Sequence, residues 1–246
     1  MSNAEQPFYR RPLWIVVAIF LAVVLVGGGI AAVTGVFNGG NNTASEPTPT
    51  TPPKTPGVPD GAASVCGLKG YETSNNLTSA PTGATWKIVG NTATPQDPKG
   101  AGPGTTNDDG TFSTCFAHTP TGALYASINY LATTSDARNV GRLSELFADG
   151  KFKDELEATP PPSSDSGDST RAQVSGFKID SYSADEASVD LALTYSGGPD
   201  DGQLVSLPVV VKWEHGDWKV LITENGAPVG PAALTSLGGY IPFSGV

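Results

Sequence analysis

The most apolar part of the chain runs from Leu13 to Phe37 and contains no charged residue. In an α-helix, about 25 residues rising 1.5 Å each cover roughly 37 Å, enough to cross the hydrocarbon core of a bilayer with some tilt. The nearest basic residues, Arg10 and Arg11, lie on its N-terminal side. The pattern predicts a single membrane helix over 13–37, with residues 1–12 in the cytoplasm and the rest extracytoplasmic.

Two other interpretations of this segment are weaker. The stretch 29–31 is similar to the small-residue cleavage site of a signal peptide, and the arginine pair to a twin-arginine export signal. The apolar run is longer than the core of a typical signal peptide, and Pro12 follows the arginines directly. An uncleaved membrane anchor is therefore favoured.

Within the predicted helix, Gly27, Ala31 and Gly35 recur every four residues. Small residues at this spacing let a second membrane helix pack closely, so these three form a candidate helix-packing face. The alternative, that small residues are simply common near a helix end, stays open.

The segment 38–63 is rich in Gly and Asn and then in Pro and Thr, without apolar periodicity. Such a composition cannot bury enough surface to fold, and its prolines favour an extended chain. We predict a disordered linker that holds the following domain up to roughly 80 Å from the membrane.

Helical periodicity begins at Thr119, a typical N-cap, which is followed by a proline at the first helical position. Apolar residues then recur at helical spacing up to Leu131. A second helix is expected from Ser135, as its cap, to Gly150, and a short third one before the prolines at 160–162.

The period changes to two after a polar loop at 163–170. Alternating apolar residues predict strands at 174–182, 188–195, 207–213 and 218–222, joined by short turns. Short turns favour an antiparallel meander, with the helices packed against its apolar face. Pro208 predicts a bulge or an edge in the third strand, and a short helix is expected at 231–237.

The segment 64–118 is rich in turns, with strands expected near 86–89 and 112–116. Cys66 and Cys115 lie outside the membrane on this topology, where oxidation predicts a disulfide between them. The predicted organisation is a cytoplasmic tail (1–12), a membrane helix (13–37), a linker (38–63), a disulfide-tied β extension (64–118) and an α+β domain with a C-terminal tail (119–246).

Composition excludes some functions. The 246 residues include 14 Lys+Arg and 24 Asp+Glu, a net charge of −10, so the chain lacks the basic surface that direct nucleic-acid binding requires. With only 2 Cys, 2 His and 1 Met, soft metal ligands are scarce, so neither a Cys/His metal site nor a cofactor is expected. Asp108 and Asp109 lack the spacing of a calcium loop and are expected in a surface turn.

Acid-base catalysis in such a domain would have to use a few Asp, Tyr and His residues. Asp190 falls on the polar face of its predicted strand and His215 in a hairpin turn, both solvated positions, and His118 precedes a helix in a structural, cap-adjacent position. No nucleophile elbow, zinc-protease motif, P-loop or dinucleotide-binding pattern is present, so we expect no enzyme. The candidates are Asp180, Asp190, Tyr182, Tyr195, His118 and His215.

Three helices, a curved meander and the hairpin from Trp213 to Trp218 resemble the nuclear transport factor 2-like (cystatin-like) cone. Behind one membrane helix, this architecture is similar to the TcpC-like bitopic assembly proteins of type IV secretion and Gram-positive conjugation. The segments Cys115–Ala126 and Leu237–Phe243 also resemble a family of uncharacterised actinobacterial membrane proteins linked to conjugation loci. TcpC-like proteins tend to carry two cones, whereas this chain has room for one.

The resemblance implies a non-enzymatic, membrane-anchored extracytoplasmic scaffold subunit of a conjugation or type IV secretion-like apparatus. Its partners would be other subunits of the machine and further copies of itself. The alternative is a receptor that binds a small molecule or an envelope component in the mouth of the cone. Aromatic residues could line that mouth or equally fill the core: Tyr125, Tyr130, Phe147, Phe177, Tyr182 and Trp213.

Overall fold

A computed structural model of the chain describes residues 62–159, 170–198, 200–222 and 231–245. Its helices are α2 (Pro120–Thr134), the 3₁₀ helix η2 (Ala137–Leu146) and α3 (Lys151–Ala158). The strands are β1 (Thr85–Val89), β2 (Thr92–Gln96), β3 (Thr105–Thr106), β4 (Ser113–Thr114), β5 (Arg171–Tyr182), β6 (Glu186–Ser196), β7 (Leu204–Glu214), β8 (Asp217–Val220), β9 (Ala232–Ala233) and β10 (Ile241–Pro242).

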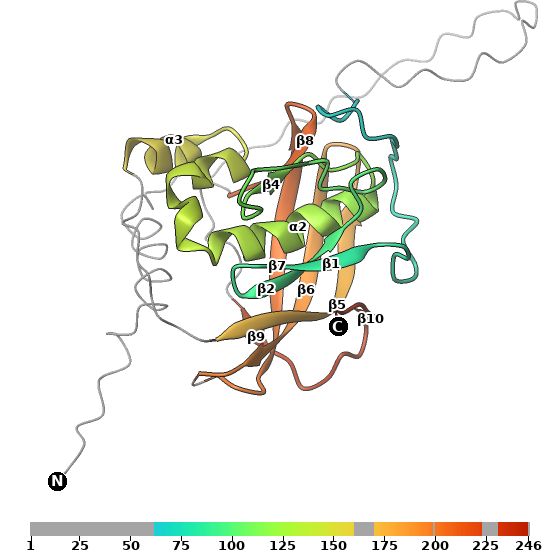
Figure 1. The fold of residues 1–246 in the computed structure, drawn as a ribbon. Helices are drawn as coiled ribbons and strands as arrows, with labels where there is room; N and C mark the ends of the chain where they lie inside the picture. The colour runs from blue at the N-terminus through green and yellow to red at the C-terminus, as the bar shows by residue number, and fades with distance from the viewer. Residues whose placement is uncertain (1–61, 160–169, 199, 223–230, 246) are drawn as a thin grey trace, which may run out of the picture.

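The long strands form the predicted antiparallel meander, and the fold is α+β. β5, β6, β7 and β8 are neighbours both in the chain and in the sheet, whose order is β1-β2-β5-β6-β7-β8. Register shifts interrupt β5 between Val174 and Gly176 and between Ile179 and Ser181. Such bulges bend and twist a strand, which accounts for the curl of the sheet in Figure 1.

Pro208 lies in β7 opposite Asp190 of β6, and the register between these two strands is unbroken. On the other side of β7, β9 pairs with Val205 and Ser206, whereas β8 pairs from Val211 onward. Pro208 therefore falls in the gap between two short partner strands, where no N–H is needed. The predicted local edge is present, but the predicted bulge is not.

α2 lies across one face of the sheet (Figure 1) and contacts β2 and β5 to β8. As predicted, Thr119 is its N-cap: the side-chain oxygen accepts the Gly122 N–H at 3.1 Å, and Pro120 follows. Leu124 and Ile128 are fully buried in the core beneath it. Their burial is the main favourable contribution of the helix to folding.

The start of the second helix differs from the prediction. Ser135 is the C-cap of α2 with helical backbone angles, and Asp136, in an extended conformation, is the N-cap of η2. Asp136 Oδ1 accepts the Arg138 N–H at 3.0 Å. An N-cap needs non-helical backbone angles to aim its side chain at the free N–H groups, and Ser135 is still part of the preceding helix.

The helix expected at 231–237 is not present. Ala232 and Ala233 form β9 instead, and further along the tail Ile241 pairs with Phe177 of β5. Phe243 then inserts into the core with 8% exposure. Pairing with unsatisfied backbone groups of β5 and β7 outweighs the weak helical tendency of a short segment.

The N-terminal extension joins the main sheet. β1 and β2 form a hairpin, and β2 continues into the sheet by pairing Thr92 with Ala172 of β5. The predicted disulfide is confirmed, and it links Cys66 to Cys115 across 49 residues of sequence. The disulfide therefore secures the long loops that surround this hairpin.

The predicted membrane helix, its candidate packing face at Gly27, Ala31 and Gly35, and nearly all of the predicted linker lie outside the described residues. Of the helices that the structure does describe, none has both the length and the apolar character needed to span a bilayer.

We expect replacement of both cysteines, Cys66→Ser with Cys115→Ser, to lower the free energy of unfolding by about 4 kcal/mol, because a loop of this length loses its covalent closure in the unfolded state. Urea unfolding of the full chain in detergent measures this. Reductant should destabilise the natural chain but not the double variant. A loss below about 1 kcal/mol would contradict the expectation.

Candidate functional site

The six predicted aromatic residues lie in three separate groups of contacting rings. Tyr125 and Phe177 pack on Phe243 of the tail, with ring centroids 6.2 Å and 5.7 Å away. Phe147 lies between Tyr130 and Phe152, at 5.8 Å and 4.8 Å. Tyr182 and Trp213 both contact Trp218, at 5.8 Å and 5.3 Å.

These rings leave little room beneath α2. A void bordered by Tyr130, Leu146 and Trp218 measures about 10 Å³, the size of about one water molecule. Tyr125, Phe147 and Phe177 are buried, whereas Tyr130, Tyr182 and Trp213 are half-buried. The aromatic residues therefore pack mainly against one another.

The segment 62–66, where the linker ends and the extension begins, is attached to the β7–β8 hairpin and to His118, and we call this contact region the linker anchor. The Val65 N–H donates to Gly216 O at 2.8 Å, one residue before the disulfide. Gly216 has a φ of +76°, and a Cβ there would lie 2.9 Å from Val65 N. Glycine is thus required both by the turn and by the close approach of the linker. The linker anchor consists of Ala62, Ser64, Val65, Cys66, Cys115, His118 and Gly216.

His118 is the buried centre of the linker anchor, with 2% exposure. Its ring stacks on Trp213 at 3.8 Å and meets Tyr71 and Trp218 edge-on. Nδ1 lies 2.9 Å from Ala62 O, and Nε2 contacts the carbonyl oxygen of Ala184. Carbonyl oxygens only accept, so both contacts are hydrogen bonds when both ring nitrogens carry a proton.

Asp217 holds the other side of the linker anchor and is 3% exposed. Its carboxylate accepts the N–H groups of Cys115 at 3.0 Å and Phe116 at 2.8 Å, more than 100 residues away in the chain. It also accepts the Trp218 N–H and pairs with Lys219. Cys115 has a φ of +68°, which L-residues rarely adopt, and these hydrogen bonds stabilise that conformation.

The expectation that Asp190 is solvated is wrong, because the residue is only 4% exposed. Its carboxylate accepts the hydroxyls of Ser206 at 2.7 Å and Tyr240 at 2.8 Å and pairs with Lys178 at 3.2 Å. The C-terminal tail, which carries Tyr240, covers the polar face of β6. Asp190 therefore fixes the tail to the outer face of the sheet.

Asp180 and Asp190 share Lys178 as a partner, but the other acid-base candidates do not join them. Asp180 is exposed and pairs with Lys178, and the Tyr182 hydroxyl donates to Glu72 O at 3.2 Å. Burial, and then the charge of Glu72, raises the pKa of Tyr182. Burial likewise raises the pKa of Tyr195, so both phenols stay protonated at neutral pH.

His215 belongs to a surface cluster with Asp149 and Glu214, the kind of group that could hold a cation. His215 Nε2 lies 2.8 Å from Asp149, whose other oxygen pairs with Lys153, and Glu214 pairs with Lys212. Each carboxylate already has a lysine partner, and a metal would have to displace both. The arrangement is an ion-pair network that joins the β7–β8 hairpin to the start of α3.

A groove of about 310 Å³ opens at the N-terminus of α2. Its walls come from four stretches of the chain: Lys69, the segment 81–82 before β1, the loop 97–101 after β2, and residues 117–125 around the start of α2. One of the six predicted aromatic residues, Tyr125, reaches this groove. The polar residues that border it are Lys69, Thr82, Asp97, Thr119, Thr121 and Tyr125.

Sequence reasoning missed Asp217 and Asp190 as structural residues and missed the groove altogether. Asp217 directly precedes Trp218 in a tight hairpin, where an aspartate is ordinarily a solvated turn residue. Its partners at 115–116 are too distant in sequence for any local pattern to reveal. Asp108 and Asp109 lie in a turn closed by the Gly110 N–H to Asn107 O at 2.9 Å, as expected.

A family profile described as a domain of unknown function, DUF8175, matches residues 46–242. The chain belongs to the DUF8175 family. The matched range takes in the end of the predicted linker and every element from β1 to β10. Comparison with curated proteins and with solved structures finds no match to this DUF8175 chain.

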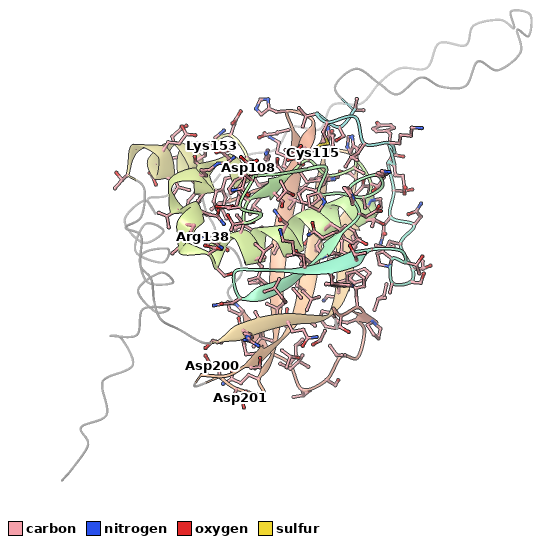
Figure 2. All side chains as sticks on the ribbon, viewed as in Figure 1. Asp108, Cys115, Arg138, Lys153, Asp200 and Asp201 are labelled. Atoms are coloured by element: carbon pink, nitrogen blue, oxygen red, sulfur yellow. A yellow bond between two sulfur atoms is a disulfide. The ribbon has the colours of Figure 1, made fainter. Side chains whose placement is uncertain are left out.

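We expect Asp217→Asn to lower the free energy of unfolding by about 3 kcal/mol, because an amide nitrogen would face buried N–H donors. The control is Asp108→Asn, in the exposed turn labelled in Figure 2, which should change stability by no more than about 0.5 kcal/mol. Urea unfolding with the disulfide intact measures both variants. Equal effects of the two substitutions would rule out the role assigned to Asp217.

Lys153, and then His215, lower the pKa of Asp149 to about 2. An aspartate in the unfolded chain titrates near 4, so the stability that Asp149 contributes is complete above about pH 4 and is lost as the pH falls to about 2. The stability difference between the natural chain and Asp149→Asn should shrink over this window and be weaker in 1 M salt. A carboxyl NMR titration of Asp149 with a midpoint near 4 would refute this.

Proposed function

We propose that the protein is a non-enzymatic, membrane-anchored scaffold subunit of an extracytoplasmic conjugation or type IV secretion-like apparatus. The observation that carries the proposal is the linker anchor. The domain holds the last residues of the linker and the first residues of the extension in place: the ring of His118 contacts Ala62, the Val65 N–H donates to Gly216, and a disulfide holds Cys66. A domain that must be held at a defined orientation to its tether benefits from such contacts.

The contacts of the acid-base candidates support a role without catalysis. His118 is enclosed by aromatic rings and carbonyl groups, and Asp190 is occupied by Ser206, Tyr240 and Lys178. His215 pairs with Asp149 at the surface. Each group has a structural partner, and none faces another candidate in a common cleft, which acid-base catalysis would need.

The proposed mode of action is contact with other proteins. Val65 and Ile88 are large apolar residues with 69% and 67% exposure. Val65 lies in the linker anchor, and Ile88 lies in β1, the terminal strand of the sheet order. The net charge of −10 implies that a transferred nucleic acid would pass without binding this surface.

In-cell photocrosslinking of the full chain tests this proposal. We expect a photoreactive amino acid at Ile88 or Val65 to crosslink to a membrane ATPase, a channel subunit or a second copy of the chain. The control position is Asp201, in the β6–β7 connection far from Cys115 (Figure 2), and it should give few such products. A gel shift under non-reducing conditions verifies that each variant keeps its disulfide.

Recovery of the chain alone from Ile88 and Val65, or adducts only with lipid and wall material, would contradict the scaffold role. The second outcome would favour the alternative, a membrane-tethered receptor. The feature that favours that alternative is the groove beside Tyr125, which is separate from the linker anchor.

A further inference from the structure

Tyr125 lines the groove at the N-terminus of α2 and has an unusual, unpaired hydroxyl group. The residue is 1% exposed, yet its hydroxyl makes no hydrogen bond within the part of the chain that the structure describes. The hydroxyl oxygen is also not completely shielded from solvent, unlike the unpaired polar atoms of the interior. A buried phenol whose oxygen lacks a partner and borders a groove is therefore aimed at whatever occupies that groove.

The Tyr125 hydroxyl is available as a donor. Burial, and then the negative charge of Asp97, raises the pKa of Tyr125 to about 12, so the proton is present at neutral pH. Asp97 is itself a wall of the groove, and its charge acts on the Tyr125 hydroxyl. An acceptor group on a ligand would relieve the unpaired donor.

The start of α2 supplies further donors. The side chain of Thr119 accepts the Gly122 N–H, and its carbonyl oxygen accepts the Ala123 N–H. Pro120 has no N–H group. Among the residues described, the Thr121 N–H is therefore left without a capping acceptor at the positive end of the helix, and Thr121 lines the groove. Lys69 adds an exposed ammonium group that forms no ion pair with the described residues. Together these groups favour an anionic acceptor.

Asp97 restricts which anion fits. Its two oxygens accept the N–H groups of Gly100 at 3.1 Å and Ala101 at 3.0 Å, and each oxygen keeps a further acceptor site. The negative charge disfavours a highly charged anion such as phosphate. A ligand that carries a carboxylate and an N–H donor close together satisfies both sides of the groove.

We propose that this groove binds the carboxylate end of an amino acid or a short peptide, with Tyr125, Thr121 and Lys69 on the carboxylate and Asp97 on the neighbouring N–H. The shape fits a small ligand, because about 310 Å³ is at the lower limit of ligand pockets. The proposal is independent of the scaffold role, since the groove does not include the linker anchor.

Calorimetry with the full chain in detergent at neutral pH tests the site, with alanyl-alanine as the probe. We expect binding at one site and a loss of affinity of about tenfold or more for the C-terminal amide of the same dipeptide, which lacks the carboxylate charge. Free alanine is the second probe. Equal binding of alanine assigns the groove to amino acids and tighter binding of the dipeptide assigns it to peptide ends, and either result supports the proposal.

The decisive variant is Tyr125→Phe, which keeps the ring in the core and removes the unpaired hydroxyl. It should bind alanyl-alanine about tenfold more weakly and keep its thermal unfolding midpoint within about 2 °C. The matched control is Tyr130→Phe in the same helix, since Tyr130 does not border this groove, and its affinity should stay within about twofold.

Three outcomes would overturn the proposal. One is the absence of binding up to about 10 mM dipeptide. Another is equal affinity of Tyr125→Phe and the natural chain. The third is inorganic phosphate binding as tightly as the dipeptide, because the groove would then select charge rather than a carboxylate with an N–H beside it.

Discussion

The whole domain depends on one buried carboxylate, that of Asp217. By accepting the backbone N–H groups of Cys115 and Phe116, it fixes the point at which the extension passes into α2. Because Cys115 is held in a left-handed conformation there, its sulfur faces Cys66 and the following residues place His118 against Trp213. Asp217, in the β7–β8 hairpin, thus helps to position the disulfide, the stack of His118 on Trp213 and the first turn of α2.

Asp190 is a second buried carboxylate that holds a distant segment in place. It holds Tyr240 of the tail as Asp217 holds residues 115–116, in both cases by supplying acceptors to a segment with little regular secondary structure of its own. Burying a carboxylate costs free energy unless both of its oxygens accept hydrogen bonds or ion pairs. Both sites meet this condition, so the extension and the tail become parts of one sheet-based body.

The parts predictable from sequence are those governed by local periodicity. Alternation in β6 and β7 and helical spacing from Thr119 determine the meander and α2, because each needs only neighbouring residues and one apolar face. The solvation of Asp190 was predicted wrongly because the tail that covers it lies 50 residues away in sequence. The groove at Tyr125 was missed for the same reason, since its walls come from four separate stretches between Lys69 and Tyr125.

The position of the disulfide has a mechanical consequence. Tension from the linker acts first on the hydrogen-bonded contacts of Ala62 and Val65 and then on Cys66, from which it passes through the sulfur–sulfur bond to Cys115, at the start of the connection to α2. The intervening residues, including the β1–β2 hairpin with Ile88 and the loop that forms one wall of the groove, lie outside this load path. A pull on the tether can therefore strain the junction with the β7–β8 hairpin while the surfaces formed by the extension keep their shape.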